Sequence, residues 1–257
     1  MNREKLKTLI TYLLAERGEK QELSRIGSDA ELFRLYRSLV NIRPAAPAEE
    51  SYLLTEDSFL TELTEEKGIT DAAALVPAEK NIYLWKGDIT TLRCGAIVNA
   101  ANSEMTGCYR PCHSCIDNCI HTFAGIRLRY ECDRIIRGQK HNEPAGQAKL
   151  TPAYDLPADH VIHTVGPIVN GELTDEHRRL LAGCYRSCLE TAAENGIESI
   201  AFCCISTGVF GYPHYEAAVT AVGTVREYLK SHDIKVIFNV FTDEDHKIYA
   251  GLLGQRI

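Results

Sequence analysis

The sequence has 257 residues, of which 45% are hydrophobic and 25% are charged, and its formal net charge is −7. Such a composition is typical of a globular protein with one large domain, or with one domain and an appendage. Net acidity argues against general nucleic-acid binding, which needs a cationic surface. No apolar run approaches the ~20 residues that cross a bilayer, and the charged N-terminus is unlike a secretory signal. We therefore expect a cytoplasmic protein with neither a membrane nor a nucleic-acid partner.

The first part of the chain, residues 1–78, is predicted to form a helical N-terminal extension. Leucine and isoleucine recur at helical spacing up to about residue 40, which predicts two helices. The second is predicted to end at Asn41–Pro44, because proline disfavours helix at the residue before it. The acidic stretch 45–80 is predicted to be a linker with one or two further helices, and the charges at 65–67 to form a solvated face. We expect the extension to pack against the rest of the protein rather than to carry chemistry.

Beyond residue 79, segments typical of strands alternate with segments typical of helices. Strands are predicted at NIYLWK (81–86), GAIVNA (95–100), HVIHTV (160–165), SIAFCCI (199–205) and KVIFNVF (235–241). Helices are predicted from 121 to about 137 and near 174–195, 214–231 and 244–253. This alternation predicts a three-layer α/β/α domain with a mixed central sheet over residues 79–257. Ligands of such folds bind beyond the carboxyl ends of the strands.

Two loops that follow predicted strands are candidates for ligand binding. In the first, Gly87–Thr90, the carboxylate of Asp88 either caps the turn that follows or accepts a hydrogen bond from a ligand amine. The second, Ile205–Pro213, contains two glycines and two hydroxyl residues. It is compatible with an ordinary turn, or with a cradle whose successive backbone N–H groups bind phosphate oxygens. Phe210 in this loop would pack against a ligand or under the loop.

A third segment is rich in residues that bind soft metals. The chain has ten cysteines, and residues 107–121 contain Cys108, Cys112, His113, Cys115, Cys119 and His121. Thiolate and imidazole are ligands that Zn²⁺ favours, so the cluster predicts a zinc site. If three residues bind, the fourth position is open for water or substrate. The alternative is a helix that starts at Pro111 and buries three of the cysteines as one stripe, which leaves Cys108 and His113 without a role.

Four segments, taken in order, resemble the signature of a macrodomain, the ADP-ribose-binding module. They are GDIT (87–90), AIVNAAN (96–102), YDLPADHVIHTVGP (154–167) and STGVFGYP (206–213). The Cys/His segment and the helical extension make the chain similar, more narrowly, to zinc-containing macrodomains, the protein-ADP-ribose hydrolases of the sirtuin-linked bacterial type. The resemblance implies an α/β/α macrodomain over residues 79–257, removal of mono-ADP-ribose from modified protein side chains, and Zn²⁺ as cofactor. It also implies a lipoylated carrier protein as a partner.

The resemblance implies roles for the residues that would hold ADP-ribose. Asp88 would accept a hydrogen bond from the adenine amino group beside the Ile89 backbone, and Asn102 would contact the distal ribose. The second ligand loop would consist of Ser206, Thr207, Gly208, Val209 and Phe210. The backbone of this loop would hold the diphosphate, while Phe210 packs on the distal ribose.

The metal and catalytic residues follow from the same resemblance. The pattern G-C-x-x-P-x-H-x-C selects Cys108, His113 and Cys115 as zinc ligands, and leaves Cys112, Cys119 and His121 with structural roles. Metal-free hydrolytic macrodomains carry V-D-G-x-I-H where this chain has I-D-N-C-I-H. Asp117 therefore matches a catalytic position, with Cys115 and Ile116 beside it at the ligand and Asn102 as a second catalytic residue.

The mechanism and the function each leave alternatives open. Zinc would either position the distal ribose by polarising one of its oxygens or lower the pKa of a bound water, with Asp117 as general base or orienting carboxylate. One rival function is a reader that binds ADP-ribosylated protein without cleaving it and holds a structural zinc. Another is a thiol-redox or metal-sensing protein without affinity for ADP-ribose.

Overall fold

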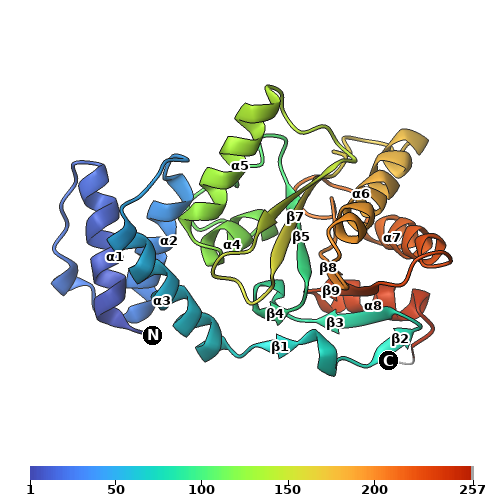
Figure 1. The fold of residues 1–257 in the computed structure, drawn as a ribbon, viewed down its shortest axis with the longest axis horizontal. Coiled ribbons are helices and arrows are strands. Elements are labelled where there is room, and N and C mark those ends of the chain that lie inside the picture. Colours follow the sequence, from blue (N-terminus) through green and yellow to red (C-terminus); the bar gives the residue numbers. More distant parts are fainter. Residues whose placement is uncertain (256–257) are drawn as a thin grey trace.

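The computed structural model describes residues 1–255, so residues 256 and 257, the end of the predicted α/β domain, lie outside the described residues. A helical N-terminal part precedes an α/β domain (Figure 1). The helical part consists of α1 (Arg3–Glu16), α2 (Asp29–Ile42) and α3 (Glu50–Lys67). Both helices predicted before residue 40 are present, and the predicted linker contains the 18-residue α3. None of the described helices combines the length and the apolar character that a membrane span requires.

The extension has an apolar core of its own. Helix α1 buries Leu6, Leu9, Ile10 and Leu13, whose spacing places them on one helical face. Helix α2 begins with a capping box, in which the Ser28 hydroxyl and the Glu31 carboxylate each accept a hydrogen bond from the other residue's backbone N–H. Local sequence signals therefore account for this part of the fold.

The α/β domain contains a mixed sheet, which confirms the predicted fold class. Its helices are α4 (Ile116–Phe123), α5 (Ile126–Gln139), α6 (Asp175–Glu194), α7 (His214–Tyr228) and α8 (Asp243–Leu252). Its strands are β1 (Thr70–Asp71), β2 (Pro77–Glu79), β3 (Ile82–Lys86), β4 (Leu92–Arg93), β5 (Ala96–Ala101), β6 (Ala148–Pro152), β7 (His160–Val165), β8 (Ser199–Phe202) and β9 (Lys235–Val240). Over residues 1–255, seven strands form one sheet in the order β2-β3-β9-β8-β5-β7-β6.

The inner strands are parallel, and the two edge strands are antiparallel to their neighbours. Strand β2 runs antiparallel to β3, and β6 runs antiparallel to β7. Helices α4 and α5 cover one side of the sheet, and α6, α7 and α8 cover the other (Figure 1). Because both faces are covered, the inner strands are apolar over most of their length. The carboxyl ends of β3, β9, β8, β5 and β7 meet at one edge.

The helix predicted from residue 121 to about 137 is wrong in its start and in its continuity. Helix α4 begins earlier, at Ile116, and a break at Gly125 separates it from α5. Gly125 has a φ of 79°, and a Cβ atom there would lie 2.8 Å from Glu56 Oε2. The backbone N–H of Ile126 donates to the same oxygen at 2.9 Å. A carboxylate far away in the sequence therefore caps α5, which no local pattern predicts.

Glu56 joins the extension to the α/β domain. Its side chain is fully buried, and Oε1 accepts hydrogen bonds from the hydroxyls of Tyr36 at 2.7 Å and Tyr52 at 2.8 Å. Three donors thus satisfy a buried carboxylate that would otherwise be costly. The domain boundary predicted between residues 78 and 79 falls inside β2, and β1, which follows α3 closely, pairs with β4.

Candidate active site

A cavity of about 750 Å³ opens at the edge of the sheet where the parallel strands end. Loops that follow β3, β5, β8 and β9 form most of its walls. The predicted site residues that line it are Asp88, Ile89, Asn102, Cys108, His113, Cys115, Ile116, Asp117, Ser206, Thr207, Gly208, Val209 and Phe210. The structure thus brings together residues that are separated by more than one hundred positions in the sequence.

The three predicted metal ligands lie side by side on this wall. The ligand atoms of Cys108, His113 and Cys115 are within 4.8 Å of one another, and Cys108 Sγ lies 3.5 Å from His113 Nδ1. Cys115 is the N-cap of α4, where its sulfur accepts a hydrogen bond from the Asn118 N–H at 3.4 Å. The alternative to the metal site, a helix that starts at Pro111, is absent among the described residues, since α4 begins at Ile116. The buried cysteine stripe is therefore wrong.

The chemistry of these donors fits Zn²⁺. Burial, together with the neighbouring Cys108 thiol, raises the pKa of the Cys115 thiol to about 12. A thiol in this state needs a nearby cation to become a thiolate ligand. Two sulfurs and one imidazole match the donor preference of zinc, and all three residues line the cavity. Cys112 is not part of this group, because its thiol donates to the Arg34 carbonyl at 3.3 Å.

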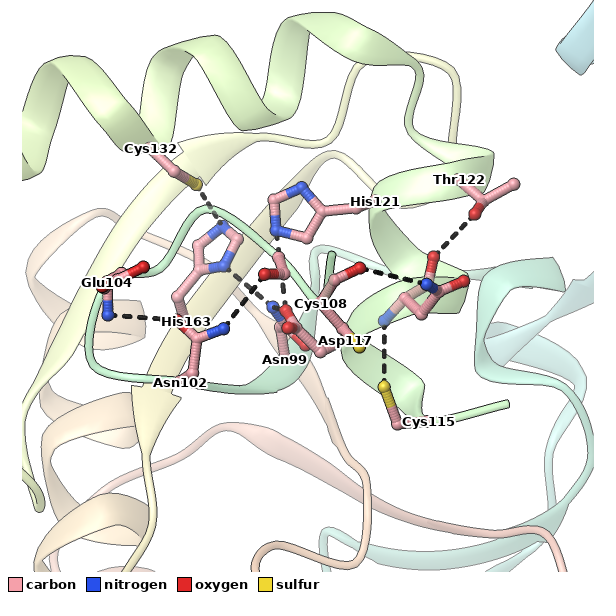
Figure 2. A network of polar contacts seen from close by, with 12 residues as sticks. Asn99, Asn102, Glu104, Cys108, Cys115, Asp117, His121, Thr122, Cys132 and His163 are labelled. Carbon is pink, nitrogen blue, oxygen red and sulfur yellow. Dashed lines mark hydrogen bonds and ion pairs between the residues drawn. The ribbon is translucent and has the colours of Figure 1, made fainter. Parts of the chain in front are cut away.

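Asp117 lies in the first turn of α4, where it lines the cavity and is 5% exposed. Its Oδ1 accepts a hydrogen bond from Asn99 Nδ2 at 2.8 Å and lies 3.6 Å from His121 Nε2 (Figure 2). Burial raises the pKa of Asp117 to about 6, although the Asn99 amide and the Arg129 guanidinium act in the opposite direction. A carboxyl group with this environment is suited to exchange a proton near neutral pH.

Asn102 directly follows β5 and shapes the loop that leads to the cysteines. Its Nδ2 donates to the Gly107 carbonyl and its Oδ1 accepts from the Glu104 N–H, each at 3.0 Å (Figure 2). Asn102 also lines the cavity. The side chain therefore fixes the start of the loop between β5 and α4 at the wall of the cavity.

The loop after β8 offers backbone donors to the cavity. Among the described residues, the N–H groups of Gly208, Val209 and Phe210 have no hydrogen-bond partner. The loop closes on itself through hydrogen bonds from Gly211 N to Gly208 O and from Tyr212 N to Ser206 O, each at 3.0 Å. Successive backbone N–H groups without a partner on such a loop can bind phosphate oxygens. This geometry supports the phosphate cradle over the ordinary turn.

Asp88 caps the turn that follows it, which is one of its two interpretations, and it also lies at the cavity where a ligand amine could reach it. Its Oδ1 caps the following turn by accepting from the Thr90 N–H at 3.0 Å and the Thr90 hydroxyl at 2.7 Å, and the residue lines the cavity. Its Oδ2 binds Lys67 Nζ at 2.6 Å. Although burial raises it, the hydrogen bonds from Lys67 and Thr90 hold the pKa of Asp88 below its ordinary value.

Residues 65–67 are exposed, as expected of a solvated face, but Lys67 also makes specific contacts. Its ammonium group pairs with Asp88 and also lies 3.9 Å from the centroid of the Phe123 ring. Through this ion pair the helical extension contacts a residue that lines the cavity.

Phe241 is a cavity residue that the sequence analysis missed as a functional residue. It directly follows β9, is 75% exposed and lines the cavity. An exposed aromatic ring at a cavity wall is suited to stack on a flat ligand group. Its position at the carboxyl end of an apolar strand was the available signal, since ligands bind there in such folds.

A second group of possible metal ligands, His121, Cys132 and His163, is buried behind Asp117 (Figure 2). Burial lowers the pKa of His163 to about 3 and raises that of the Cys132 thiol, so both are neutral. Burial and the Arg129 guanidinium also lower the pKa of His121. All three side chains are buried away from the cavity, and the Arg129 guanidinium is a fixed cation close enough to lower the pKa of His121, so we interpret this group as polar packing.

Comparisons with known proteins identify the family of this chain. A family model described as Macro domain matches residues 98–221. A protein of Treponema medium named protein-ADP-ribose hydrolase is 49% identical over 252 residues, covering 96% of this chain and 97% of that protein. A protein of the same name from Staphylococcus aureus is 46% identical over 258 residues, covering 99% of this chain and 97% of its own. The crystal structure of a Trypanosoma brucei macrodomain in complex with ADP-ribose matches with a TM-score of 0.65 and 32% identity, covering 85% of this chain and 95% of that one.

The two named relatives align with nearly the whole chain, so the similarity includes the helical extension as well as the α/β domain. The order of strands, the cavity at their carboxyl ends and the match of residues 98–221 agree with one another. The chain belongs to the macrodomain family.

Proposed function

We propose that this protein is a zinc-dependent hydrolase that removes mono-ADP-ribose from modified protein side chains. The observation that carries the proposal is that one cavity holds a loop with free N–H groups, a Cys-His-Cys trio and the buried carboxyl group of Asp117. The name of the Treponema medium and Staphylococcus aureus relatives supports hydrolysis of ADP-ribose linkages. The Trypanosoma brucei complex supports ADP-ribose as the ligand of this cavity.

The proposed ligand position follows the wall of the cavity. The adenine amino group donates to Asp88, while the base stacks on Phe241. The diphosphate accepts hydrogen bonds from the N–H groups of residues 208–210. The distal ribose would then lie toward Asn102 and Asp117, beside the trio of Cys108, His113 and Cys115.

The residues of the chain would orient the ribose and move the proton. Bound to Cys108, His113 and Cys115, zinc would act as a Lewis acid toward an oxygen of the distal ribose or of the acceptor linkage. Asp117 would accept a proton from the attacking water, since its carboxyl group faces the same cavity. The water oxygen replaces the acceptor side chain at C1″ of the ribose, and the acceptor leaves with a proton. Because the chain resembles zinc-containing macrodomains, we propose that a lipoylated carrier protein is one of its ADP-ribosylated substrates.

Removal of zinc tests the proposal directly. Turnover of a mono-ADP-ribosylated protein is expected to disappear after complete chelation of zinc and to return when Zn²⁺ is added back. Binding of free ADP-ribose, measured by calorimetry, is expected to survive chelation, because the phosphate loop and Asp88 do not need the metal. Unchanged turnover in zinc-free protein would contradict the metal dependence. Tight ADP-ribose binding without turnover in both forms would indicate a reader.

Truncation of the exposed ring at the cavity wall tests the proposed ligand position. We expect Phe241→Ala to weaken ADP-ribose binding by about 1–3 kcal/mol, the usual contribution of an aromatic ring stacked on a base. Calorimetric titration with ADP-ribose measures this change. The matched control is Tyr215→Ala, which removes an aromatic ring that is 56% exposed and does not line the cavity. Equal affinities of the two variants would place the base elsewhere.

A further inference from the structure

We infer that helix α2 of the extension acts as a template, in that it fixes the shape of the loop between β5 and α4, which we call the metal loop. Two residues of α2, Arg37 and Asn41, would thereby set the zinc affinity of the trio Cys108, His113 and Cys115. Both side chains bind the loop from behind, outside the set of residues that line the cavity. They are therefore positioning residues. The inference rests on the proposed function insofar as it requires a metal ion at the trio.

The loop between β5 and α4 has little support of its own. From Gly107 to Ser114, its described backbone makes one hydrogen bond to itself, from the His113 N–H to the Arg110 carbonyl at 3.2 Å. Cys112 adopts a φ of 54°, in the left-handed region that a cysteine rarely occupies. Such a segment holds a defined shape only if other parts of the protein fix it.

Arg37 holds both halves of the loop through one nitrogen atom. Its Nη2 donates to the His113 carbonyl at 2.6 Å and to Asn118 Oδ1 at 2.9 Å. Asn118 is 1% exposed, and its Nδ2 donates to the carbonyls of Cys108 at 3.2 Å and Arg110 at 3.0 Å. Arg37 is thus linked to the backbone of two predicted metal ligands, directly for His113 and through Asn118 for Cys108.

Asn41 follows Arg37 by one helical turn and contacts the same region. Its Oδ1 accepts from the Cys112 N–H at 2.9 Å, and its Nδ2 donates to the Thr122 hydroxyl of α4 at 3.0 Å. Residues four apart share a helical face, so α2 presents a row of polar groups to the loop and to α4. The row fixes the loop backbone at Cys112 and His113 relative to Cys115 at the start of α4.

This support has a consequence for metal binding. A metal that binds a loose loop must also order it, and that ordering weakens the observed affinity. Groups outside the metal ligands that orient them contribute about 10–100-fold to metal affinity in other proteins. Loss of the α2 contacts is therefore expected to weaken zinc binding without touching the adenine or phosphate contacts.

The test measures zinc affinity on the full chain by competition with a chromophoric chelator, for wild type, Arg37→Ala, Arg37→Lys and the control Arg25→Ala. Arg25 lies in the same extension, and its side chain is 82% exposed. We expect Arg37→Ala to raise the zinc Kd by about 10–100-fold. Arg37→Lys should lie between it and wild type, because a lysine retains the charge but not the planar guanidinium. The Kd of Arg25→Ala and all ADP-ribose Kd values should be unchanged.

The results that would contradict this inference can be told apart from one another. A folded Arg37→Ala protein with the zinc Kd of wild type overturns the template and leaves the proposed function intact. A wild-type protein that binds no zinc overturns the metal site and the template together. Joint loss of zinc and ADP-ribose binding indicates general disruption instead of a specific effect on the loop. If metal-free Arg37→Ala shows no cooperative thermal unfolding, it is not folded. The zinc and ADP-ribose Kd values of Arg37→Lys then decide between the same outcomes.

Discussion

An Asp117→Asn variant is expected to lose turnover by about 10²–10⁴-fold, the usual contribution of a general acid or base. The substitution removes the proton acceptor and little else. The asparagine oxygen can still accept the hydrogen bond that Asn99 donates to Asp117 Oδ1 at 2.8 Å. Because burial disfavours the ionised carboxylate, a neutral amide of the same size should not lower the free energy of unfolding. Turnover of a mono-ADP-ribosylated protein and calorimetric binding of ADP-ribose measure the two effects separately.

The control for this variant is Asp133→Asn, which removes a carboxylate from α5 that pairs with Arg137 and lies outside the cavity. The control should keep wild-type turnover. Zinc content is measured for both variants, so that a lost metal is not mistaken for a lost base. Wild-type turnover in Asp117→Asn with full zinc occupancy would show that another group accepts the proton.

A Glu56→Ala variant is expected to lower the free energy of unfolding by about 3 kcal/mol or more, because each buried polar group left without a partner costs roughly 1–3 kcal/mol. Three donors lose their acceptor at once: the hydroxyls of Tyr36 and Tyr52 and the backbone N–H of Ile126. Urea denaturation with linear extrapolation measures the change.

Two further variants serve as comparisons for Glu56→Ala. Glu65→Ala truncates an exposed glutamate of the same helix and should leave the midpoint unchanged. Glu56→Gln keeps a side-chain oxygen that can accept a hydrogen bond. Its decrease in the free energy of unfolding should therefore lie between those of Glu65→Ala and Glu56→Ala. If Glu56→Ala and Glu65→Ala unfold at the same urea concentration, the buried carboxylate does not stabilise the contact between the extension and the α/β domain.

The parallel strands at the centre of the fold were predictable, because strands buried on both faces read as continuous apolar runs. Strands β3, β7, β8 and β9 lie within predicted segments, and β5 extends one residue beyond its predicted end. The edge strand β6 was missed, since its sequence, Ala148–Pro152, includes a lysine and a proline and lacks an apolar run. The break before α5 was missed for a different reason, because a capping group from α3 defines it.

Much of the site could be placed from sequence because its residues follow strands that share one edge of the sheet. Each strand and the loop that follows it can be read from the local sequence. Because the strands are parallel, their following loops then meet at the cavity. Lys67 and Arg37 could not be placed, since their partners, Asp88 and the metal loop, are remote in sequence. Their role depends on how the extension packs, which periodicity within a helix does not determine.

The pairing of Lys67 with Asp88 limits what the carboxylate can still bind. An ionised carboxylate has about four acceptor positions, and Thr90 occupies two on Oδ1 while Lys67 occupies one on Oδ2. A single lone pair therefore remains for an incoming N–H. Under the proposed function, a purine with an exocyclic amine can supply that hydrogen, whereas one with a carbonyl at the same position brings a second acceptor and is repelled. The carboxylate of Asp88 thus favours a nucleobase with an amino group, and the contact with Lys67 leaves that carboxylate room for a single hydrogen bond from the base.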